Sequence, residues 1–403
     1  MKYLVIVPDG AGDNEMIELN GKTPLQVADM PNANGMAARG VVGMVSNVPE
    51  GIIPGSDAAN LSVMGYDPKI YLTGRSPLEA ASMGVTMEDS DVSYRVNFVT
   101  LDGQGEFSNL IMKDHSAGDL TTEEAAPLVQ VLNGAFQDER KKFYHGTAYR
   151  QCLVLKNGST NVKLIPPHDI PDQVIGEHLP KGDESQLLLD LMEKSYSLLK
   201  DHPFNIEREK QGKNPANSIW IWGEGKKPSL PQFRDKYQIR GTVVSAVDLI
   251  KGIGVCAGLD TVDIHGATGT ADTNFKGKAQ AAIEAFEKGS DFVYVHVEGP
   301  DECSHQGDLE GKIRCIEDID HLITGPVIEY LDQIGEDYKV LIVPDHRTPV
   351  KLRKHSMPPV PFVMYHKNEE NPEDKDRIFA EIAGEKGEYF ASGCSLADYF
   401  FSG

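Results

Sequence analysis

The sequence is poor in cysteine, in long apolar runs and in positive charge, and each shortage excludes a class of protein. Only five of the 403 residues are cysteines, an odd number without a Cys-x-x-Cys pair. This excludes a disulfide framework and favours a reducing cytoplasm. No uninterrupted apolar run reaches the length that a membrane span needs. The apolar residues 3–7 lead directly into Pro8 and lack the cleavage site of a signal peptide. We therefore expect a cytoplasmic protein without a membrane partner.

Basic residues are outnumbered, which bears on the partners that this chain can bind. The 39 lysines and arginines face 61 aspartates and glutamates, and the formal net charge is −22. Such a balance argues against binding nucleic acid or an anionic membrane through bulk electrostatics. A small anionic substrate would need local cations, which bound divalent metal ions and a few arginines can supply. The sequence leaves the oligomeric state open.

The length and the order of predicted elements indicate two domains. A chain of 403 residues is long for one domain. Strands and helices alternate in residues 1–85 and 229–403, which predicts an α/β sandwich with a mostly parallel central sheet. Residues 86–228 mix hairpins and amphipathic helices instead. We therefore predict a smaller α+β domain, 86–228, inserted into a discontinuous α/β domain.

Three apolar runs of the predicted sheet each end near an aspartate, at Asp9, Asp301 and Asp345. The carboxyl ends of parallel strands line one edge of a sheet, where ligands bind. Three carboxylates at one edge repel each other unless a cation neutralises them. His305 and His346 stand close to two of them, and His355 follows. Carboxylates combined with imidazoles suit Mn²⁺ or Zn²⁺ better than Ca²⁺. The pattern predicts a two-metal centre, and the alternative is a set of helix-capping aspartates.

Ser56 follows Pro54-Gly55 at a predicted junction between a loop and a helix. Its hydroxyl has two competing roles, because it can cap the helix or face an anion at the helix N-terminus. Asp57 can take over the cap and release Ser56. Two divalent ions would lower the pKa of the hydroxyl so that it attacks phosphorus. Acyl transfer is disfavoured, because the chain has no Gly-x-Ser-x-Gly elbow.

Six segments together carry a resemblance that spans nearly the whole chain. They are Pro8-Asp9-Gly10, Pro54-Gly55-Ser56-Asp57-Ala58-Ala59-Asn60, Tyr71-Leu72-Thr73-Gly74-Arg75, Gly299-Pro300-Asp301 with His305, Pro344-Asp345-His346, and Lys354-His355-Ser356. In this combination the chain resembles the archaeal-type cofactor-independent phosphoglycerate mutases of the alkaline phosphatase superfamily. The resemblance also includes Gly266-Ala267-Thr268-Gly269.

The resemblance implies a glycolytic isomerase that interconverts 2- and 3-phosphoglycerate through phospho-Ser56, without free bisphosphoglycerate. It implies two divalent ions, usually Mn²⁺, with Mg²⁺, Zn²⁺ or Co²⁺ as alternatives. One ion would be held by Asp301, His305 and His355. The other would be held by Asp9, Ser56, Asp345 and His346. The inserted domain would bind the glycerate.

The substrate cations are expected among Arg75, His115, Arg150 and Lys226, each of which is otherwise a solvated basic residue. We expect His296, in the middle of a strand, to be a core histidine. Trp220 and Trp222 share one face of a strand and are expected to pack in a core or at a hinge. Lys251 is a candidate for a lysine that assists the transfer in longer enzymes. Arg347 stands where a small residue is usual, so the rim of the pocket is expected to differ.

Two other activities compete with mutase activity. One is a homoserine kinase-like phosphotransferase of the same family, although the chain has no Gly-x-x-x-x-Gly-Lys-Ser/Thr loop for a nucleotide. The other is a phosphomonoesterase, if water reaches phospho-Ser56 before the glycerate hydroxyl does. A binding module without activity is disfavoured, because buried carboxylates and histidines are costly without metal.

Overall fold

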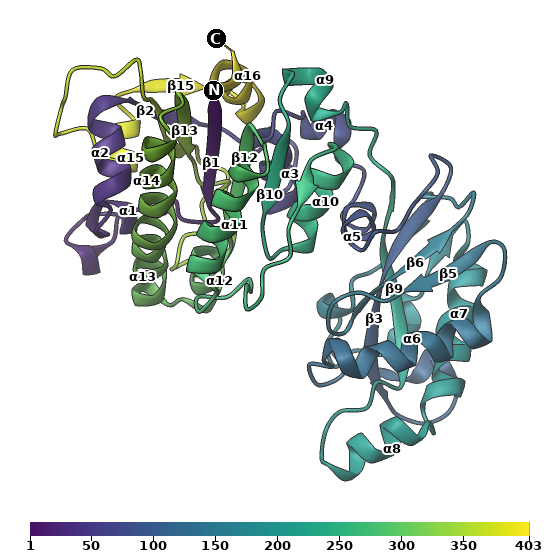
Figure 1. The fold of residues 1–403 in the computed structure, drawn as a ribbon. Helices are drawn as coiled ribbons and strands as arrows, with labels where there is room; N and C mark the ends of the chain where they lie inside the picture. The colour runs from purple at the N-terminus through teal and green to yellow at the C-terminus, as the bar shows by residue number, and fades with distance from the viewer. Residues whose placement is uncertain (403) are drawn as a thin grey trace. The chain divides into compact units, whose positions relative to one another are not determined.

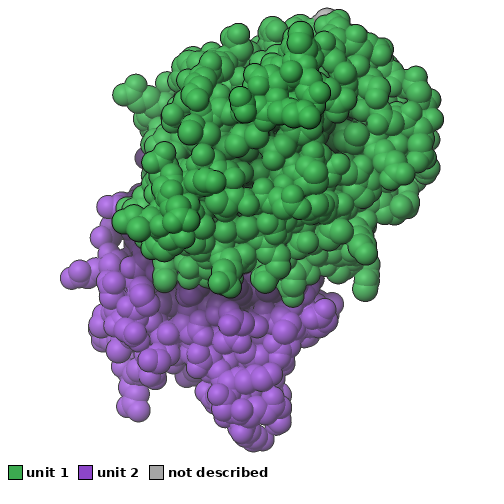
Figure 2. Space-filling view, turned by 90° about the vertical axis from the view of Figure 1, so that its left-hand side faces the viewer, with its two compact units in different colours: residues 1–72, 229–403 green, residues 73–228 purple. Residues whose placement is uncertain are grey.

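The computed structural model describes residues 1–402, and the chain forms two compact units. Unit 1 contains Met1–Leu72 together with Ser229–Gly403, and unit 2 contains Thr73–Pro228. Figure 2 colours unit 1 green and unit 2 purple. No helix within the described residues is both long enough and apolar enough to cross a membrane.

Unit 1 is built on an eight-stranded sheet in the order β11-β10-β12-β1-β13-β14-β2-β15 (Figure 1). The strands are β1 (Lys2–Pro8), β2 (Val41–Val45), β10 (Gly241–Val244), β11 (Asp260–Thr261), β12 (Phe292–Val297), β13 (Tyr338–Ile342), β14 (Val360–His366) and β15 (Glu388–Phe390). The five strands from β11 to β13 run parallel, while β14 is antiparallel to both of its neighbours. The predicted α/β class with a mostly parallel sheet is confirmed.

Helices cover this sheet on both faces, as the alternation of side chains along β1 indicates. Leu4 and Ile6 belong to the core cluster formed with α2, α11, α13 and α14. Tyr3, which points to the opposite face, packs edge-on against Phe400 and at a tilt against Phe401 of α16. The helices of unit 1 are α1 (Pro24–Val27), α2 (Pro31–Arg39), α3 (Ser56–Val63), α4 (Pro68–Tyr71), α9 (Phe233–Tyr237), α10 (Asp248–Cys256), α11 (Phe275–Glu287), α12 (Gly299–Gln306), α13 (Leu309–Ile319), α14 (Gly325–Ile334), α15 (Glu381–Gly384) and α16 (Gly393–Phe401).

Unit 2 has its own sheet and its own apolar core. The sheet follows the order β4-β3-β6-β5, and β9 pairs with the other side of β3. A separate two-stranded pair joins β7 and β8. The elements are α5 (Ser76–Ser82), β3 (Val92–Asp102), β4 (Ile111–Asp114), α6 (Thr122–Phe136), β5 (Lys141–Tyr144), β6 (Arg150–Leu155), β7 (Val162–Lys163), β8 (Lys181–Gly182), α7 (Ser185–Leu199), α8 (Pro203–Lys210) and β9 (Ser218–Lys226).

The first boundary of unit 2 lies at Thr73, whereas the sequence placed it at residue 86. The reason is the helix α5, which contacts β3, β6 and β9. Glu79 of α5 forms an ion pair with Arg95 of β3 at 3.0 Å. Thr73 donates a hydrogen bond to the Lys226 carbonyl at the end of β9. These contacts join residues far apart in the chain, so they leave no local pattern in the sequence.

Candidate active site

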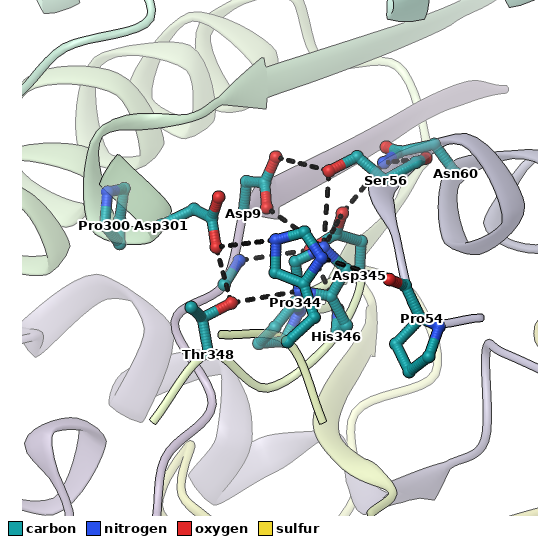
Figure 3. Close-up of polar contacts among 12 residues, drawn as sticks. Asp9, Pro54, Ser56, Asn60, Pro300, Asp301, Pro344, Asp345, His346 and Thr348 are labelled. Atoms are coloured by element: carbon teal, nitrogen blue, oxygen red, sulfur yellow. Dashed lines mark hydrogen bonds and ion pairs between the residues drawn. The ribbon is translucent and has the colours of Figure 1, made fainter. Parts of the chain in front are cut away.

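Three adjacent parallel strands, β12, β1 and β13, each lead to one of the predicted aspartates. Asp9 follows β1 directly, Asp301 lies in the first turn of α12, and Asp345 lies in the loop after β13. Their exposed fractions are 0%, 6% and 1%. Figure 3 shows the three carboxylates grouped with His346 and Ser56. The structure therefore brings the three strand-end aspartates together, as the order of elements predicted.

The first cluster contains Asp9, Asp345 and His346, whose potential ligand atoms all lie within 4.8 Å of one another. His346 Nε2 lies 3.4 Å from Asp345 Oδ2 and 3.7 Å from Asp9 Oδ1. The backbone N–H groups of Gly10 and His346 donate to Asp345 Oδ1 at 3.1 and 2.8 Å. These bonds fix the Asp345 carboxylate in the loop.

The second cluster contains Asp301, His346 and His355, so His346 belongs to both clusters. His355 Nε2 lies 3.5 Å from Asp301 Oδ1, and His305 Nε2 lies 3.2 Å from Asp301 Oδ2. His305 Nε2 and His355 Nε2 are 3.0 Å apart. The other ring nitrogens of these two histidines, both Nδ1, face the carbonyls of Arg353 and Pro54. Each ring is thereby oriented with Nε2 toward Asp301.

The donor set fits divalent cations. Asp9 Oδ1 is buried and has no hydrogen-bond partner among the described residues. Burial, together with the nearby carboxylates of Asp345 and Asp301, raises the pKa of Asp9 well above its ordinary value. Such crowding of buried carboxylates is relieved by a cation. Carboxylate oxygens and imidazole nitrogens at this density suit Mn²⁺ or Zn²⁺.

The histidines near Asp301 have shifted pKa values. The hydrogen bond to Asp301 raises the pKa of His305 to about 9. Burial opposes ionisation of Asp301, but the hydrogen bonds from His305 and His355 outweigh it and lower the pKa of Asp301. Burial lowers the pKa of His346, which favours the neutral imidazole that a metal ion requires. His346 is thus already neutral, whereas His305 must release a proton before its Nε2 can bind a cation.

Ser56 is the first residue of α3, and its hydroxyl does not cap that helix. The N-cap is Gly55, without a side-chain capping bond, and Asp57 Oδ1 accepts the N–H of Ala58. Ser56 Oγ instead lies 3.3 Å from Asp9 Oδ2 and 3.3 Å from His346 Nε2 (Figure 3). The hydroxyl is therefore presented to the carboxylate cluster at the N-terminus of a helix, where the dipole favours an anion.

Two residues that hold the side chains of this cluster, Asn60 and Thr348, were not predicted from the sequence. Asn60 Nδ2 donates to the Ser56 carbonyl at 2.8 Å and to Asp345 Oδ2 at 2.9 Å. Thr348 Oγ1 donates to Asp301 Oδ1 and lies 3.2 Å from His346 Nδ1. The spacing of four residues between Ser56 and Asn60 places them on one face of α3, and this spacing could have indicated Asn60.

His296 was expected to be an ordinary core histidine, and this interpretation was incomplete. Its side chain is fully buried, but His296 Nε2 lies 2.9 Å from Asp9 Oδ2. Burial lowers the pKa of His296 to about 3. His296 therefore supports a carboxylate of the cluster.

The predicted substrate cations of unit 2 are gathered with aromatic rings. The Arg150 guanidinium lies 5.1 Å from the centre of the Tyr149 ring. The His115 ring lies 6.0 Å from the same tyrosine and 6.2 Å from His168. Burial lowers the pKa of His168, and the charge of Arg75, the N-cap residue of α5, lowers it further.

Two further residues of this group were not predicted as substrate residues. Arg95 lies 4.3 Å from the centre of the Trp222 ring, and His168 lies 5.2 Å from the same ring. Trp220 is buried in the core as expected, whereas Trp222 is half-buried beside these basic groups. We call Arg75, Arg95, His115, Arg150, His168 and Trp222 the basic cluster of unit 2.

The remaining sequence candidates lie elsewhere. Lys226 ends β9 in register with Val92, where its carbonyl accepts a hydrogen bond from Thr73. Lys251 pairs with Asp263 at 2.7 Å. Arg347 is buried and donates from Nε to the Pro359 carbonyl and from Nη1 to the Asp13 carbonyl. Arg347 therefore stabilises the loops around Pro359 and Asp13 through its guanidinium.

Comparison with known proteins places the chain in a family. The sequence model of the 2,3-bisphosphoglycerate-independent phosphoglycerate mutases matches residues 37–205. The chain is 49% identical to the enzyme of that name from Methanothrix thermoacetophila over 366 residues, which cover 90% of each chain. It is 44% identical to the one from Methanosarcina barkeri over 388 residues, which cover 96% of each chain.

Solved structures agree with this assignment. A cofactor-independent phosphoglycerate mutase from Thermoplasma acidophilum matches with a TM-score of 0.67 and 26% identity, covering 99% of both chains. A protein from Pyrococcus horikoshii matches with a TM-score of 0.82 and 28% identity, covering 99% of this chain and 96% of that one. The chain belongs to the 2,3-bisphosphoglycerate-independent phosphoglycerate mutase family.

Proposed function

We propose that this protein interconverts 2-phosphoglycerate and 3-phosphoglycerate by transferring the phosphoryl group through Ser56. The observation that carries this proposal is the position of the Ser56 hydroxyl, which lies 3.3 Å from both Asp9 Oδ2 and His346 Nε2 and does not cap its helix. A hydroxyl in this place can pass its proton to a neighbouring group and attack phosphorus. The names of the relatives support the same substrate pair.

Two divalent metal ions, with Mn²⁺ as our choice, are proposed to complete the site. The residues that would hold them are Asp301, His305 and His355 for one ion, and Asp9, Ser56, Asp345 and His346 for the other. When bound, the ions supply a lowered pKa at the hydroxyl and neutralise charge on the transferring group. The crowded carboxylates support this proposal, as does Asp9 Oδ1, which is buried and accepts no hydrogen bond from the described residues.

The chain's own residues would carry the two halves of the transfer. In the first half, Ser56 Oγ forms a bond to phosphorus, and the bond between phosphorus and the glycerate oxygen breaks. That oxygen takes up the proton which Ser56 released. In the second half, the other hydroxyl of the glycerate attacks phospho-Ser56, and the serine oxygen regains a proton. No free bisphosphoglycerate is needed.

We propose that unit 2 binds the glycerate through its basic cluster. Arg75, Arg150 and His115 were predicted for this role, and Arg95 and His168 join them. Guanidinium groups bind carboxylates and phosphates with two parallel hydrogen bonds. A concentration of positive charge in a chain with a net charge of −22 also overcomes the general repulsion of an anion.

The five cysteines are free thiols, which supports our proposal of a reducing cytoplasm.

The test is turnover of 3-phosphoglycerate by purified protein with Mn²⁺ and without bisphosphoglycerate, coupled through enolase. Ser56→Ala should abolish turnover and leave the thermal unfolding midpoint within a few degrees of the wild type. Ser62→Ala is the matched control, since Ser62 lies on the same helix, where its hydroxyl contacts Cys394. Full activity of Ser56→Ala would refute the covalent route.

The same protein preparation tests the two competing activities. Release of inorganic phosphate without formation of 2-phosphoglycerate would favour a phosphomonoesterase. ATP-dependent phosphorylation of homoserine, without mutase turnover, would overturn the leading proposal.

A further inference from the structure

A chain of hydrogen bonds runs from the end of β10 to the metal-facing carboxylate of Asp9. Ser245 follows β10, His296 lies near the end of β12, and Asp9 follows β1. The exposed fractions of the three residues are 1%, 0% and 0%. Ser245 Oγ lies 3.3 Å from His296 Nδ1, and His296 Nε2 lies 2.9 Å from Asp9 Oδ2. The contacts connect three strands that are neighbours in the sheet.

The direction of these bonds follows from the donors. The Val247 N–H donates to Ser245 Oγ at 3.0 Å, so the hydroxyl accepts there and has its own proton to give. The ammonium of the buried Lys278 donates to the His296 carbonyl at 2.9 Å. This positive charge disfavours protonation of the nearby His296 ring, which is therefore neutral. A neutral imidazole carries a single N–H. An ionised carboxylate only accepts, so the single N–H lies at His296 Nε2, facing Asp9, and the Ser245 hydroxyl donates to His296 Nδ1.

The two oxygens of Asp9 consequently have different roles. Oδ2 accepts from His296 and lies 3.3 Å from the Ser56 hydroxyl. Oδ1 is buried and has no hydrogen-bond partner among the described residues. A carboxylate held at one oxygen by a donor points its other oxygen in a set direction.

We propose that Ser245 and His296 are positioning residues for the metal centre: Ser245 selects the Nε2–H tautomer of His296, which fixes Asp9 with Oδ1 directed at a divalent cation. This inference rests on the proposed metal centre. It assigns a role in metal affinity to a serine that does not touch Asp9. Without the Ser245 hydroxyl, the other tautomer becomes accessible, and a bare Nε2 would then face the carboxylate and repel it.

The experiment measures Mn²⁺ binding by isothermal titration calorimetry, and the ring tautomer by ¹⁵N NMR of histidine-labelled protein kept free of metal. Removing such outer partners typically costs 10- to 100-fold in metal affinity. Ser245→Ala should weaken Mn²⁺ binding about 10-fold, and His296→Leu by up to about 100-fold. His296→Gln, which retains a donor near the position of Nε2, should bind more tightly than His296→Leu. In the wild type Nε2 should be the protonated nitrogen, and Ser245→Ala should show a mixture of tautomers.

Ser290→Ala is the matched control. Ser290 is a buried serine that pairs with Thr242 Oγ1 at 2.8 Å, at the opposite end of the same two strands. If the serines only support packing, both serine variants should lower the thermal unfolding midpoint equally, and neither should change Mn²⁺ affinity. Wild-type affinity and an unchanged tautomer in Ser245→Ala would overturn the inference.

The result also separates this inference from the proposed function. Absence of Mn²⁺ binding in the wild type would overturn the metal centre, and the positioning role with it. Tight Mn²⁺ binding without turnover of phosphoglycerate would overturn only the proposed reaction.

Discussion

Lys312 Nζ lies 2.8 Å from Asp13 Oδ2, and neither side chain is exposed by more than 1%. The same ammonium donates to the carbonyls of Gly12 and Thr348 at 3.3 and 3.0 Å. Val350 N donates to the same Asp13 oxygen. Because Thr348 also holds Asp301, this buried ion pair ties α13 to the loop that carries the second cluster.

Replacing Lys312 by methionine should destabilise unit 1 strongly. The substitution leaves the Asp13 carboxylate buried without its cation, which typically costs about 3–5 kcal/mol. The free energy of unfolding, measured by chemical denaturation, should fall by that amount. Lys288→Met is the control, because its pair with Glu284 is exposed and should contribute no more than about 1 kcal/mol. Equal losses in the two variants would contradict the role of burial.

The stability of the wild type should depend on pH through Lys278. Burial lowers the pKa of this ammonium from its ordinary value near 10.5 to about 8. Between these pH values the unfolded chain binds the additional proton, so the contribution of Lys278 to stability rises with pH. The wild type should gain about 3 kcal/mol relative to Lys278→Met between pH 8 and pH 10.5. Lys276→Met is the control, because Lys276 is an exposed residue of the same helix, α11, and its replacement should leave the pH dependence of stability unchanged. If the difference in stability between the wild type and Lys278→Met is independent of pH, the lowered pKa is refuted.

Removing divalent ions should lower the thermal unfolding midpoint. A ligand at 100 times its dissociation constant stabilises the folded state by about 2.7 kcal/mol, which corresponds to several degrees for a protein of this size. Scanning calorimetry should show an upward shift with Mn²⁺ and its reversal by EDTA. Asp301→Asn should reduce the shift. Asp320→Asn is the control, because Asp320 caps α2 through the N–H groups of Asn32 and Ala33, and this variant should keep the Mn²⁺ shift.

Removing a guanidinium from the basic cluster should weaken substrate binding. Arg150→Ala should raise the KM for 3-phosphoglycerate about 10- to 100-fold, since a hydrogen bond to a charged group contributes about 1.5–3 kcal/mol. The kcat should change less than the KM, as expected for binding that is equal in the ground and transition states. Lys210→Ala, at an exposed position of α8, should leave both constants unchanged. An unchanged KM in Arg150→Ala would exclude this arginine from the substrate site.

The strand-end aspartates could be predicted because their signal is local. Asp9, Asp301 and Asp345 each follow an apolar run, and parallel strands present their carboxyl ends at one edge of a sheet. Ser56 could be predicted as a candidate for a similar reason, since Pro54-Gly55 marks the start of a helix. Whether its hydroxyl caps that helix could not be predicted, because the answer depends on Asp9 and His346, which are distant in the chain.

The role of His296 depended on strand register. His296 pairs with Val7 across β12 and β1, so its ring reaches the carboxylate two residues after Val7, directly beyond the end of β1. An isolated strand gives no information about its neighbour, and a histidine in an apolar run therefore looks like core. The basic cluster is a comparable case, because its members come from the N-cap of α5, from β3, β6 and β9, and from two connecting segments around His115 and His168.

By itself, the sequence determined the α/β class, the three carboxylates and the serine at a helix start, since periodicity and strand ends are properties of short segments. Only the tertiary structure decided that His346 belongs to both clusters, that Asp9 Oδ1 is buried without a hydrogen bond from the described residues, and that unit 2 begins at Thr73. These features are set by distances between residues that lie far apart along the chain. Such distances are determined when the sheet and its helices pack together.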